Sequence, residues 1–515
     1  MVQGWHGSSG RIWYSVVVGR LSFSPLSTCE VKIRVGRRKK DSGHVERSYG
    51  ILPFVLEEVE GTPSVTPRAG LVTVAEAARG MGLPAVVTDA VGLKQRERGF
   101  TDWDFIESFL LLIADGGECV EDLAVLRADL AFAELVGHAF PSPSAGKKYL
   151  YGFHDDAEDA AVAEQRALFP SFVPAEAVPL AGLGSVNDHL LRQAQARHRE
   201  ATATLDHDGT IIPSTKREAA KTYDGTRGYQ PSLVLWAEQD LVVADEFRDG
   251  NVPAASDVLG VVQQAFQSLP PGIDQVYYRA DSASYDHKLL NWLREADEET
   301  GRPRAIFAVS ADMSPELRAA AEAAAVWHRD PDDPCRSWAE LDFVPSGPST
   351  KKGRRPDRYL GIRIEPRQKE LFADGSEVKY FAVVTNDFER EGLELLQWQR
   401  AKAGTVEHTH DVLKNDLAAG VLPSGRFGTN AAWLRLNVLV YNLLSVLRRT
   451  ALPKEFARAR PKRLRFHLFA AAATLIHHAR QTVVRMVGAF ETLATRLSRV
   501  RRALWQSTPV WAAGG

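Results

Sequence analysis

The order of β-type runs and helical stretches between residues 201 and 309 constrains the fold of this chain more than any other feature. Three β-type runs come first, followed by a helix, a strand, a second helix and a further strand. Such an order is typical of an α/β layer, in which helices cover a mixed sheet. We expect strands at 201–205, 232–236, 241–247, 275–280 and 305–309, and helices at 254–269 and 286–296.

Three antiparallel strands followed by helix, strand, helix and strand make up a ribonuclease-H-like layer. The first and fourth strands of such a sheet are central neighbours, so their ends meet. Three further β-type runs between residues 338 and 385 indicate a β-rich insertion into this layer. Helices are expected after the insertion at 392–400, at 405–418 with Thr405 as its cap, and at 430–449, where apolar residues lie on most sides.

The first strand ends in Leu205-Asp206-His207-Asp208-Gly209-Thr210. Residues two apart in a strand point to the same face, so Asp206 and Asp208 could converge on one cation or one phosphate. An Asp-rich turn is the alternative, because Asp-Gly is a common turn pair.

Two further acids stand at comparable positions. Asp281 ends the fourth strand, and Glu407 lies in the first turn of the helix after the insertion. Taken singly, each could be a turn residue or a partner of the helix dipole. Together with Asp208 they form a set of three carboxylates suited to two magnesium ions, which would activate a water or a 3′-hydroxyl and stabilise a departing 3′-oxygen.

Three segments containing these acids resemble the catalytic boxes of DDE transposases from bacterial insertion sequences. They are residues 205–210, Tyr278-Arg279-Ala280-Asp281-Ser282, and Gly404-Thr405-Val406-Glu407-His408-Thr409-His410-Asp411-Val412-Leu413-Lys414-Asn415. The resemblance extends from about Thr73 to about Arg449. More specifically, the chain resembles the group of these transposases whose ribonuclease-H-like core is interrupted by a β-rich insertion before the catalytic Glu.

This resemblance implies an enzyme that moves a DNA element by cut-and-paste transposition. Asp208, Asp281 and Glu407 would be both the catalytic residues and the ligands of two Mg²⁺ ions, for which Mn²⁺ can substitute. The partners would be double-stranded DNA, as terminal inverted repeats and as target, and a second copy of the chain on paired ends. Asp206 would be a supporting residue on the same strand face as Asp208.

The same group places a Tyr, an Arg and a Lys around the catalytic Glu. Lys414 matches the Lys, seven residues after Glu407, whereas Arg400 stands where Tyr is expected and Ala403 where Arg is expected. Lys402 or Arg400 would then substitute as the phosphate clamp. Relatives also hold a displaced base with tryptophans of the insertion. Trp327 and Trp338 lie in that region, although core packing is the alternative for both.

Basic residues are concentrated near the C-terminus. Between Arg448 and Arg502 there are fourteen Lys or Arg residues against two Glu residues, a formal charge of +12, although the whole chain carries −2. Such a block indicates a binding surface for a polyanion such as nucleic acid, or else a helix face that is exposed to solvent. We expect Arg448 and Arg449 to contact DNA, and Lys147 and Lys148 to contact phosphates unless they lie in a plain loop.

Two other classes of function remain open. Asp-x-Asp-Gly-Thr also fits haloacid-dehalogenase-type phosphohydrolases, in which Asp206 would be the nucleophile and Asp208 the general acid with one magnesium. However, only three residues precede Asp206 in its apolar run, and this fold explains neither the basic block nor Glu407. The other alternative is a DNA-binding relative that has lost catalysis.

The remaining features indicate a cytoplasmic, nucleoid-associated protein without a membrane partner. Three scattered cysteines suit a reducing compartment, and neither an export signal nor an apolar run of membrane-spanning length is expected. The expected regions are a basic leader at 1–68, a helical DNA-binding region at 69–200, the two parts of the catalytic core at 201–312 and 391–450, the β-rich insertion at 313–390, and a basic helical region at 451–515.

Overall fold

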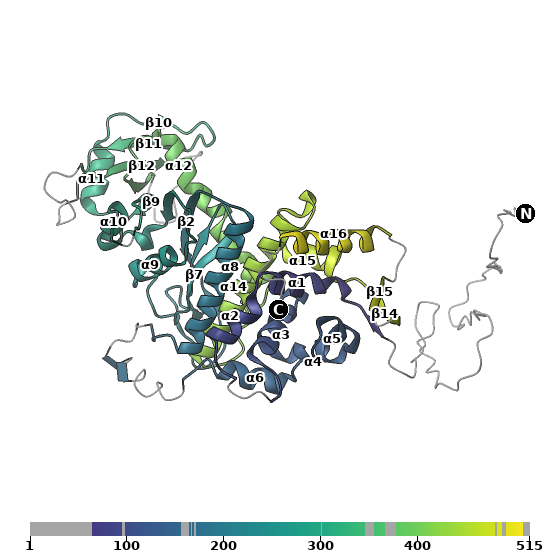
Figure 1. Ribbon diagram of the computed structural model, residues 1–515. Helices are drawn as coiled ribbons and strands as arrows, with labels where there is room; N and C mark the ends of the chain where they lie inside the picture. The colour runs from purple at the N-terminus through teal and green to yellow at the C-terminus, as the bar shows by residue number, and fades with distance from the viewer. Residues whose placement is uncertain are drawn as a thin grey trace, which may run out of the picture. The chain divides into compact units, whose positions relative to one another are not determined.

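A nine-stranded mixed sheet is the largest sheet among the described residues of the computed structural model (Figure 1). The structure describes residues 64–94, 98–155, 164–165, 167–168, 171, 173–299, 301–345, 355–365, 377–478, 481–486 and 491–507. The expected leader therefore lies outside the described residues as far as Pro63.

One half of the sheet has the ribonuclease-H-like order β7-β6-β2-β8-β9. β6 pairs antiparallel with both β2 and β7, whereas β8 pairs parallel with both β2 and β9. The prediction that the first and fourth strands are central neighbours is thus confirmed. The strands are β2 (Thr202–Gly209), β6 (Ser232–Trp236), β7 (Leu241–Glu246), β8 (Gln275–Ala280) and β9 (Ala305–Ala311).

The insertion lengthens this same sheet. β13 pairs antiparallel with β9, and β12, β11 and β10 follow it outward in an antiparallel series. A second core of Trp338, Leu360, Leu395 and other residues lies between this half of the sheet and α12. The insertion contains α11 (Pro315–Ala323), β10 (His328–Arg329), β11 (Arg336–Leu341), β12 (Arg358–Ile364) and β13 (Lys379–Thr385).

Helices α9 (Val258–Ser268) and α10 (His287–Arg294) make the connections into β8 and β9. Beyond the insertion the chain forms α12 (Gly392–Arg400), a short 3-10 turn at Ala401–Gly404, and α13 (Val406–Asn415). These elements agree with the expected helices within a few residues. They bring Glu407 back to the sheet from a position about 200 residues beyond Asp208 in the sequence.

The long helix α14 (Phe427–Thr450) is buried along almost its whole length. Its polar residues fix it to the sheet: Asn442 hydrogen bonds to both the N–H and the C=O of Val242 in β7, each over 2.8 Å. Buried Arg435 donates to Asp245 at 3.1 Å and to Glu176 at 2.7 Å. These polar contacts fix the register of α14 more narrowly than its apolar face alone would.

Short helices of the N-terminal region pack around α14. Thr101 and Asp104 form a capping box at the start of α3. The helices are α1 (Val72–Gly80), α2 (Leu83–Ala90), α3 (Asp102–Asp115), α4 (Leu123–Ala128), α5 (Leu130–Val136), α6 (Pro143–Tyr151) and α8 (Val178–Arg197).

The C-terminal region differs from the helical region that the sequence indicated. Besides α15 (Pro461–Leu464) and α16 (Glu491–Ser507), it contains a hairpin of β14 (Ala473–His478) and β15 (Gln481–Met486). β14 also pairs with β1 (Val65–Thr66), so residues expected in the leader complete a three-stranded sheet. α16 lies along α1 (Figure 1).

In the part of the chain that the structure describes, no single helix combines the length and the apolar character needed to cross a membrane. Two segments, Ala69–Gly80 and Leu83–Ala90, meet that test only as a pair, with a bend of 63° at the break between them.

Candidate functional site

Asp208 and Asp281 line one cavity of about 240 Å³ at the ends of the two central strands. Asp208 is the penultimate residue of β2, with 15% of its side chain exposed. Asp281 follows β8 directly and caps a short 3-10 turn by accepting a hydrogen bond from the N–H of Ala283 at 3.1 Å. The parallel pairing of β2 with β8 is what brings these two carboxylates to one place.

Glu407 lies in the first turn of α13 with its side chain exposed, and it does not line that cavity. Its charge nevertheless reaches Asp208. Burial raises the pKa of Asp208 to about 6, the nearby Lys402 ammonium opposes this shift, and the Asp281 and Glu407 carboxylates reinforce it. Asp281 lies 73 residues after Asp208, and Glu407 lies a further 126 residues on, yet the three acids share one electrostatic environment.

The raised pKa of Asp208 leads to a prediction about the free energy of unfolding of the chain. The folded chain binds the Asp208 proton more tightly than the unfolded chain does, so stability is lost as the pH rises from 3.8, the usual pKa of Asp, to about 6, and the loss is complete above that pH. Asp208→Asn should stabilise the metal-free protein at pH 7.5 by about 1–3 kcal/mol, with a smaller gain at pH 5. Urea unfolding of both forms in EDTA at the two pH values measures this. Equal or lower stability of the variant at pH 7.5 would contradict it.

Two basic side chains lie against Asp208. The ammonium of Lys402, on the 3-10 turn before α13, is buried and lies 3.4 Å from Asp208 Oδ1. His410 Nε2 lies 3.9 Å from Asp208 Oδ2, and among the described residues neither ring nitrogen of His410 makes a hydrogen bond. Burial, reinforced by the Lys414 and Lys402 charges, lowers the pKa of His410 to about 3. Sequence reasoning did not single out His410, because a histidine on a helix face carries no distinctive spacing.

Asp206 has a structural role in this arrangement. It is fully buried, and Arg279 on the adjacent β8 donates to both of its oxygens, at 2.6 and 2.7 Å. The hydroxyl of Thr405 also donates to Asp206, so Thr405 does not cap α13 as expected. Arg279 in addition donates to the C=O of Trp398 in α12 at 2.6 Å. This group, which we call the Asp206 clamp, ties β2 and β8 to the helices that carry Glu407.

The Asp206 clamp disfavours the phosphohydrolase interpretation. A nucleophile must be accessible to its substrate, and Asp206 has 0% exposure with both oxygens bound. In addition, β2 has an antiparallel neighbour, β6. The sequence did contain a signal for this ion pair: Arg279 stands inside an apolar strand, where a buried cation needs an acidic partner.

The three residues expected as phosphate contacts near Glu407 lie in different surroundings. Lys414 Nζ donates to Thr210 Oγ1 at 2.8 Å, just beyond Asp208, and burial lowers its pKa. Lys402 contacts Asp208 as described above. Arg400 instead points to the insertion, where it donates to Asp330 at 2.9 Å. Lys414 and Lys402 therefore lie beside the acids, and Arg400 does not.

The two tryptophans of the insertion pack within the protein. Trp338 is buried and stacks on His328 with ring centroids 4.7 Å apart. Trp327 is half-buried beside Tyr380, and the Arg363 guanidinium lies 4.9 Å from its ring centroid. Core packing, the alternative left open for both residues, accounts for these contacts.

The four other basic residues that we expected to contact DNA lie in two different kinds of surroundings. Lys147 and Lys148 lie on α6, whose start Ser142 caps, rather than in a plain loop, and Lys148 is exposed. Arg448 is buried and donates to Asp240 and to the C=O of Ala459, each at 2.8 Å. Arg449 donates to Glu200 at 3.0 Å. The expectation that Arg448 contacts DNA is not supported, because its guanidinium is occupied within the core.

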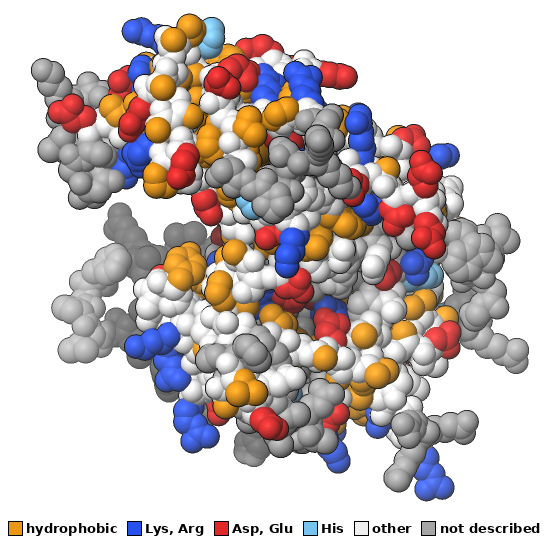
Figure 2. All heavy atoms as spheres, turned by 90° about the vertical axis from the view of Figure 1, so that its left-hand side faces the viewer, with side chains coloured by type: hydrophobic (Ala, Val, Ile, Leu, Met, Phe, Trp, Pro, Cys, Tyr) orange, Lys and Arg blue, Asp and Glu red, His pale blue; other side chains and the backbone are white. Residues whose placement is uncertain are grey.

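Much of the remaining basic block is also paired internally. Arg460 and Lys462 lie 2.7 and 3.2 Å from Asp416, and Arg501 lies 2.6 Å from Glu76. On the face that includes the insertion, basic and acidic side chains are interspersed (Figure 2). Because of the ion pairs within the basic block, its charge of +12 overstates the basic surface that is available to a polyanion.

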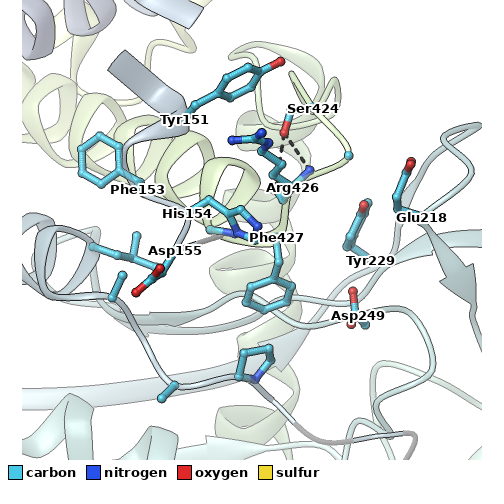
Figure 3. Close-up of a pocket in the computed structure, with 16 residues that line it drawn as sticks. Tyr151, Phe153, His154, Asp155, Glu218, Tyr229, Asp249, Ser424, Arg426 and Phe427 are labelled. Atoms are coloured by element: carbon cyan, nitrogen blue, oxygen red, sulfur yellow. Dashed lines mark hydrogen bonds between the residues drawn. The ribbon is translucent and has the colours of Figure 1, made fainter. Parts of the chain in front are cut away.

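A second cavity, of about 450 Å³, lies away from the acids (Figure 3). It is bounded by the end of α6, by the segment between β2 and β6, and by the residues leading into α14. Arg426 lies over the ring of Tyr151, 4.5 Å from its centroid, and Ser424 Oγ accepts from the N–H of Arg426 at 2.9 Å. None of Asp208, Asp281 and Glu407 lines this cavity, so it is not the candidate site.

The chemistry of the three acids fits a divalent cation. Carboxylates are the ligands that Mg²⁺ prefers. Burial is the main cause of the raised pKa of Asp208, the Asp281 and Glu407 carboxylates add to it, and a bound cation would oppose both effects. The positions of the three side chains do not yet form a metal site, because among the described residues no group of three or more His, Cys, Asp or Glu side chains is arranged to hold a metal ion. The donor types fit, and the cluster is not preformed.

The sheet order and the acids at the ends of its central strands define a protein of the ribonuclease-H-like class. The family model described as transposase DDE domain, group 1, matches residues 56–505, and the chain belongs to this family. It is accordingly a transposase, an enzyme that cleaves and transfers DNA. No match was found among curated proteins.

The solved structures similar to this chain include the cryo-EM structure of a piggyBac transposase synaptic complex with hairpin DNA. The alignment covers 88% of this chain and 84% of that chain, with 9% identity and a TM-score of 0.45.

Proposed function

We propose that the protein is a cut-and-paste transposase of a bacterial insertion sequence, which cleaves and joins DNA strands at the inverted-repeat ends of its element. The observation that carries this proposal is the common environment of Asp208, Asp281 and Glu407, since Asp208 and Asp281 share a cavity and the Asp281 and Glu407 charges both raise the pKa of Asp208. Membership of the DDE family supplies the reaction class.

The chain's own residues would have separate roles in this reaction. Asp208, Asp281 and Glu407 would hold two Mg²⁺ ions, or Mn²⁺ in their place, and these ions would supply an activated oxygen nucleophile and charge stabilisation at the phosphodiester. Lys414, whose ammonium reaches Thr210 beside Asp208, would bind a neighbouring phosphate. Lys402 would neutralise Asp208 when no metal is bound.

Strand cleavage by the purified chain tests the proposal. The substrate is a labelled duplex that carries the DNA flanking the gene, and we expect Mg²⁺-dependent cleavage that EDTA abolishes. Two such ends should be held by two copies of the chain, which light scattering on the complex would measure. The proposal would be contradicted if the chain hydrolysed a small phosphomonoester, such as p-nitrophenyl phosphate, and did not cleave DNA.

Part of the basic block remains available to DNA. Arg458, Arg499 and Arg502 are exposed, and they form no ion pair with another described residue. Arg499 and Arg502 are three residues apart and so share one side of α16, while Leu497, Val500 and Leu504 are buried. These three arginines, with Lys147 and Lys148, replace Arg448 in our proposal for DNA contacts. The protein would act on the nucleoid in the cytoplasm.

The salt dependence of binding tests these contacts. Changing Arg458, Arg499 and Arg502 together to Gln should reduce the log–log slope of affinity against salt by about 0.9 for each phosphate that is no longer neutralised. The measurement is fluorescence anisotropy with a labelled duplex at several NaCl concentrations. A matched control changes Arg496 and Arg501, which pair with Glu455 and Glu76, and should alter the slope less. An unchanged slope in the triple variant would show that these arginines do not contact DNA.

A further inference from the structure

The segment between β2 and β6 places an exposed aromatic ring beside the candidate site. This segment forms a small sheet of β3 (Ile212–Pro213), β4 (Ala220–Lys221) and β5 (Arg227–Tyr229). Tyr223, in the turn from β4 to β5, lines the cavity of Asp208 and Asp281, yet it is 82% exposed. A large ring left in water at the edge of a site is a candidate for contact with a ligand.

The turn that carries Tyr223 is well defined. Thr222 Oγ1 donates to Asp224, and Asp224 also accepts from the N–H of Thr226 at 2.9 Å. The N–H of Thr222 donates to the C=O of Thr226 at 2.8 Å, and Gly225 adopts the positive φ of 86° that closes the turn. Because the backbone on both sides is held, fixing the Tyr223 ring against a ligand costs little conformational entropy.

The surroundings of Tyr223 favour a polyanion. Lys221 adjoins it and is exposed, and Arg217 on the same segment has a side chain that is 93% exposed and lies 3.8 Å from Glu218. The adjoining acid, Asp224, is bound within the turn. Lys414 reaches Thr210, at the point where this segment leaves β2. An exposed aromatic ring with basic neighbours is the combination by which proteins hold unpaired nucleotides, the ring stacking on a base and the charges following the backbone.

We propose that Tyr223 is a positioning residue that stacks on the nucleobase next to the scissile phosphate. This inference rests on the proposed function. The cavity takes the phosphate between the acids, and the neighbouring base lies at its edge against the Tyr223 ring. Stacking there would hold the strand so that one particular phosphodiester faces Asp208 and Asp281.

Photocrosslinking tests this contact without cleavage. The flanking-DNA duplex carries 5-iododeoxyuridine at single positions around the cleavage point, and the protein carries Asp208→Asn. We expect a crosslink that mass spectrometry assigns to Tyr223 at one position adjoining the junction. Tyr223→Ala should abolish this crosslink. In the chain with Asp208 intact, Tyr223→Ala should also lower the cleavage rate about tenfold or more, the usual effect of removing one stacked base.

Two controls separate stacking from other roles. Tyr223→Phe keeps the ring and should retain both crosslink and cleavage, whereas Phe381→Ala removes an exposed ring of β13 outside the cavity and should change neither. Wild-type cleavage by Tyr223→Ala overturns the inference and leaves the proposed function intact. Equal loss in Tyr223→Phe and Tyr223→Ala overturns stacking in favour of the hydroxyl. A wild-type chain that neither binds nor cleaves the duplex overturns the proposed function and this inference with it.

Discussion

Asp208→Asn, Asp281→Asn and Glu407→Gln are each expected to lower the rate of DNA strand cleavage by on the order of 10³-fold or more. Each change removes one negative charge from a set that would hold the metal ions, and it leaves the size of the side chain almost unchanged. Binding of the DNA end should be retained, because the contacts that we propose with the phosphate backbone are made by other residues. Gel-based cleavage and anisotropy binding on the same preparations would separate the two effects.

A matched control uses an acid outside the site. Glu322 is exposed on α11, and Glu322→Gln removes the same charge without touching the cavity, so cleavage should stay at the wild-type rate. Asp206→Asn is a second comparison, since we expect its effect to arise from reduced stability. Normal cleavage by Asp208→Asn would remove Asp208 from the catalytic set.

The second large effect concerns the Asp206 clamp. Asp206→Ala leaves the Arg279 guanidinium, which is 5% exposed, without its carboxylate partner. Breaking one side of a buried ion pair costs about 3–5 kcal/mol, so the free energy of unfolding should fall by that amount. The contacts of Thr405 and Trp398 with this pair predict that α12 and α13 loosen first. Urea unfolding measures the decrease in stability, and hydrogen exchange locates it.

The double variant Asp206→Leu/Arg279→Met is the control for the clamp. Replacing both charges with apolar groups of similar volume leaves no unpaired charge, so most of the stability should return. A phosphohydrolase with Asp206 as its nucleophile would instead show a stable and inactive Asp206 variant. Wild-type stability of Asp206→Ala would show that the clamp does not hold the fold.

The sequence predicted the centre of the fold because periodicity and strand order carry that information locally. The strands that end at Asp208 and Asp281 were recognisable as short β-type runs, and the ribonuclease-H-like order predicted that they are neighbours, as their pairing shows. The small sheet before β6 and the pairing of β1 with β14 were not predicted. Both depend on two- or three-residue strands, which carry too few residues for a period to emerge.

Side-chain roles were harder to predict than backbone elements. Whether Arg448 contacts DNA or Asp240 depends on a partner 208 residues away, and a sum of charges contains no such information. Thr405 has the residue type of a helix cap, yet the buried Asp206 carboxylate takes its hydroxyl. In the candidate site, the resemblance to the transposase boxes predicted Asp208 rather than Asp206 and named Lys402 near Glu407, whereas His410 and Tyr223 reach the site only through tertiary packing.

The most direct test of the central claim is metal rescue at the three acids. Asp208→Cys, Asp281→Cys and Glu407→Cys each replace a hard oxygen ligand with sulfur, which binds Mg²⁺ poorly and softer ions such as Mn²⁺ better. We predict that the cleavage of the flanking-DNA duplex is lost with Mg²⁺ and is partly restored with Mn²⁺, while wild type cleaves with both. Cleavage by Asp208→Cys at the wild-type rate with Mg²⁺ alone would contradict the claim that this carboxylate holds the catalytic metal.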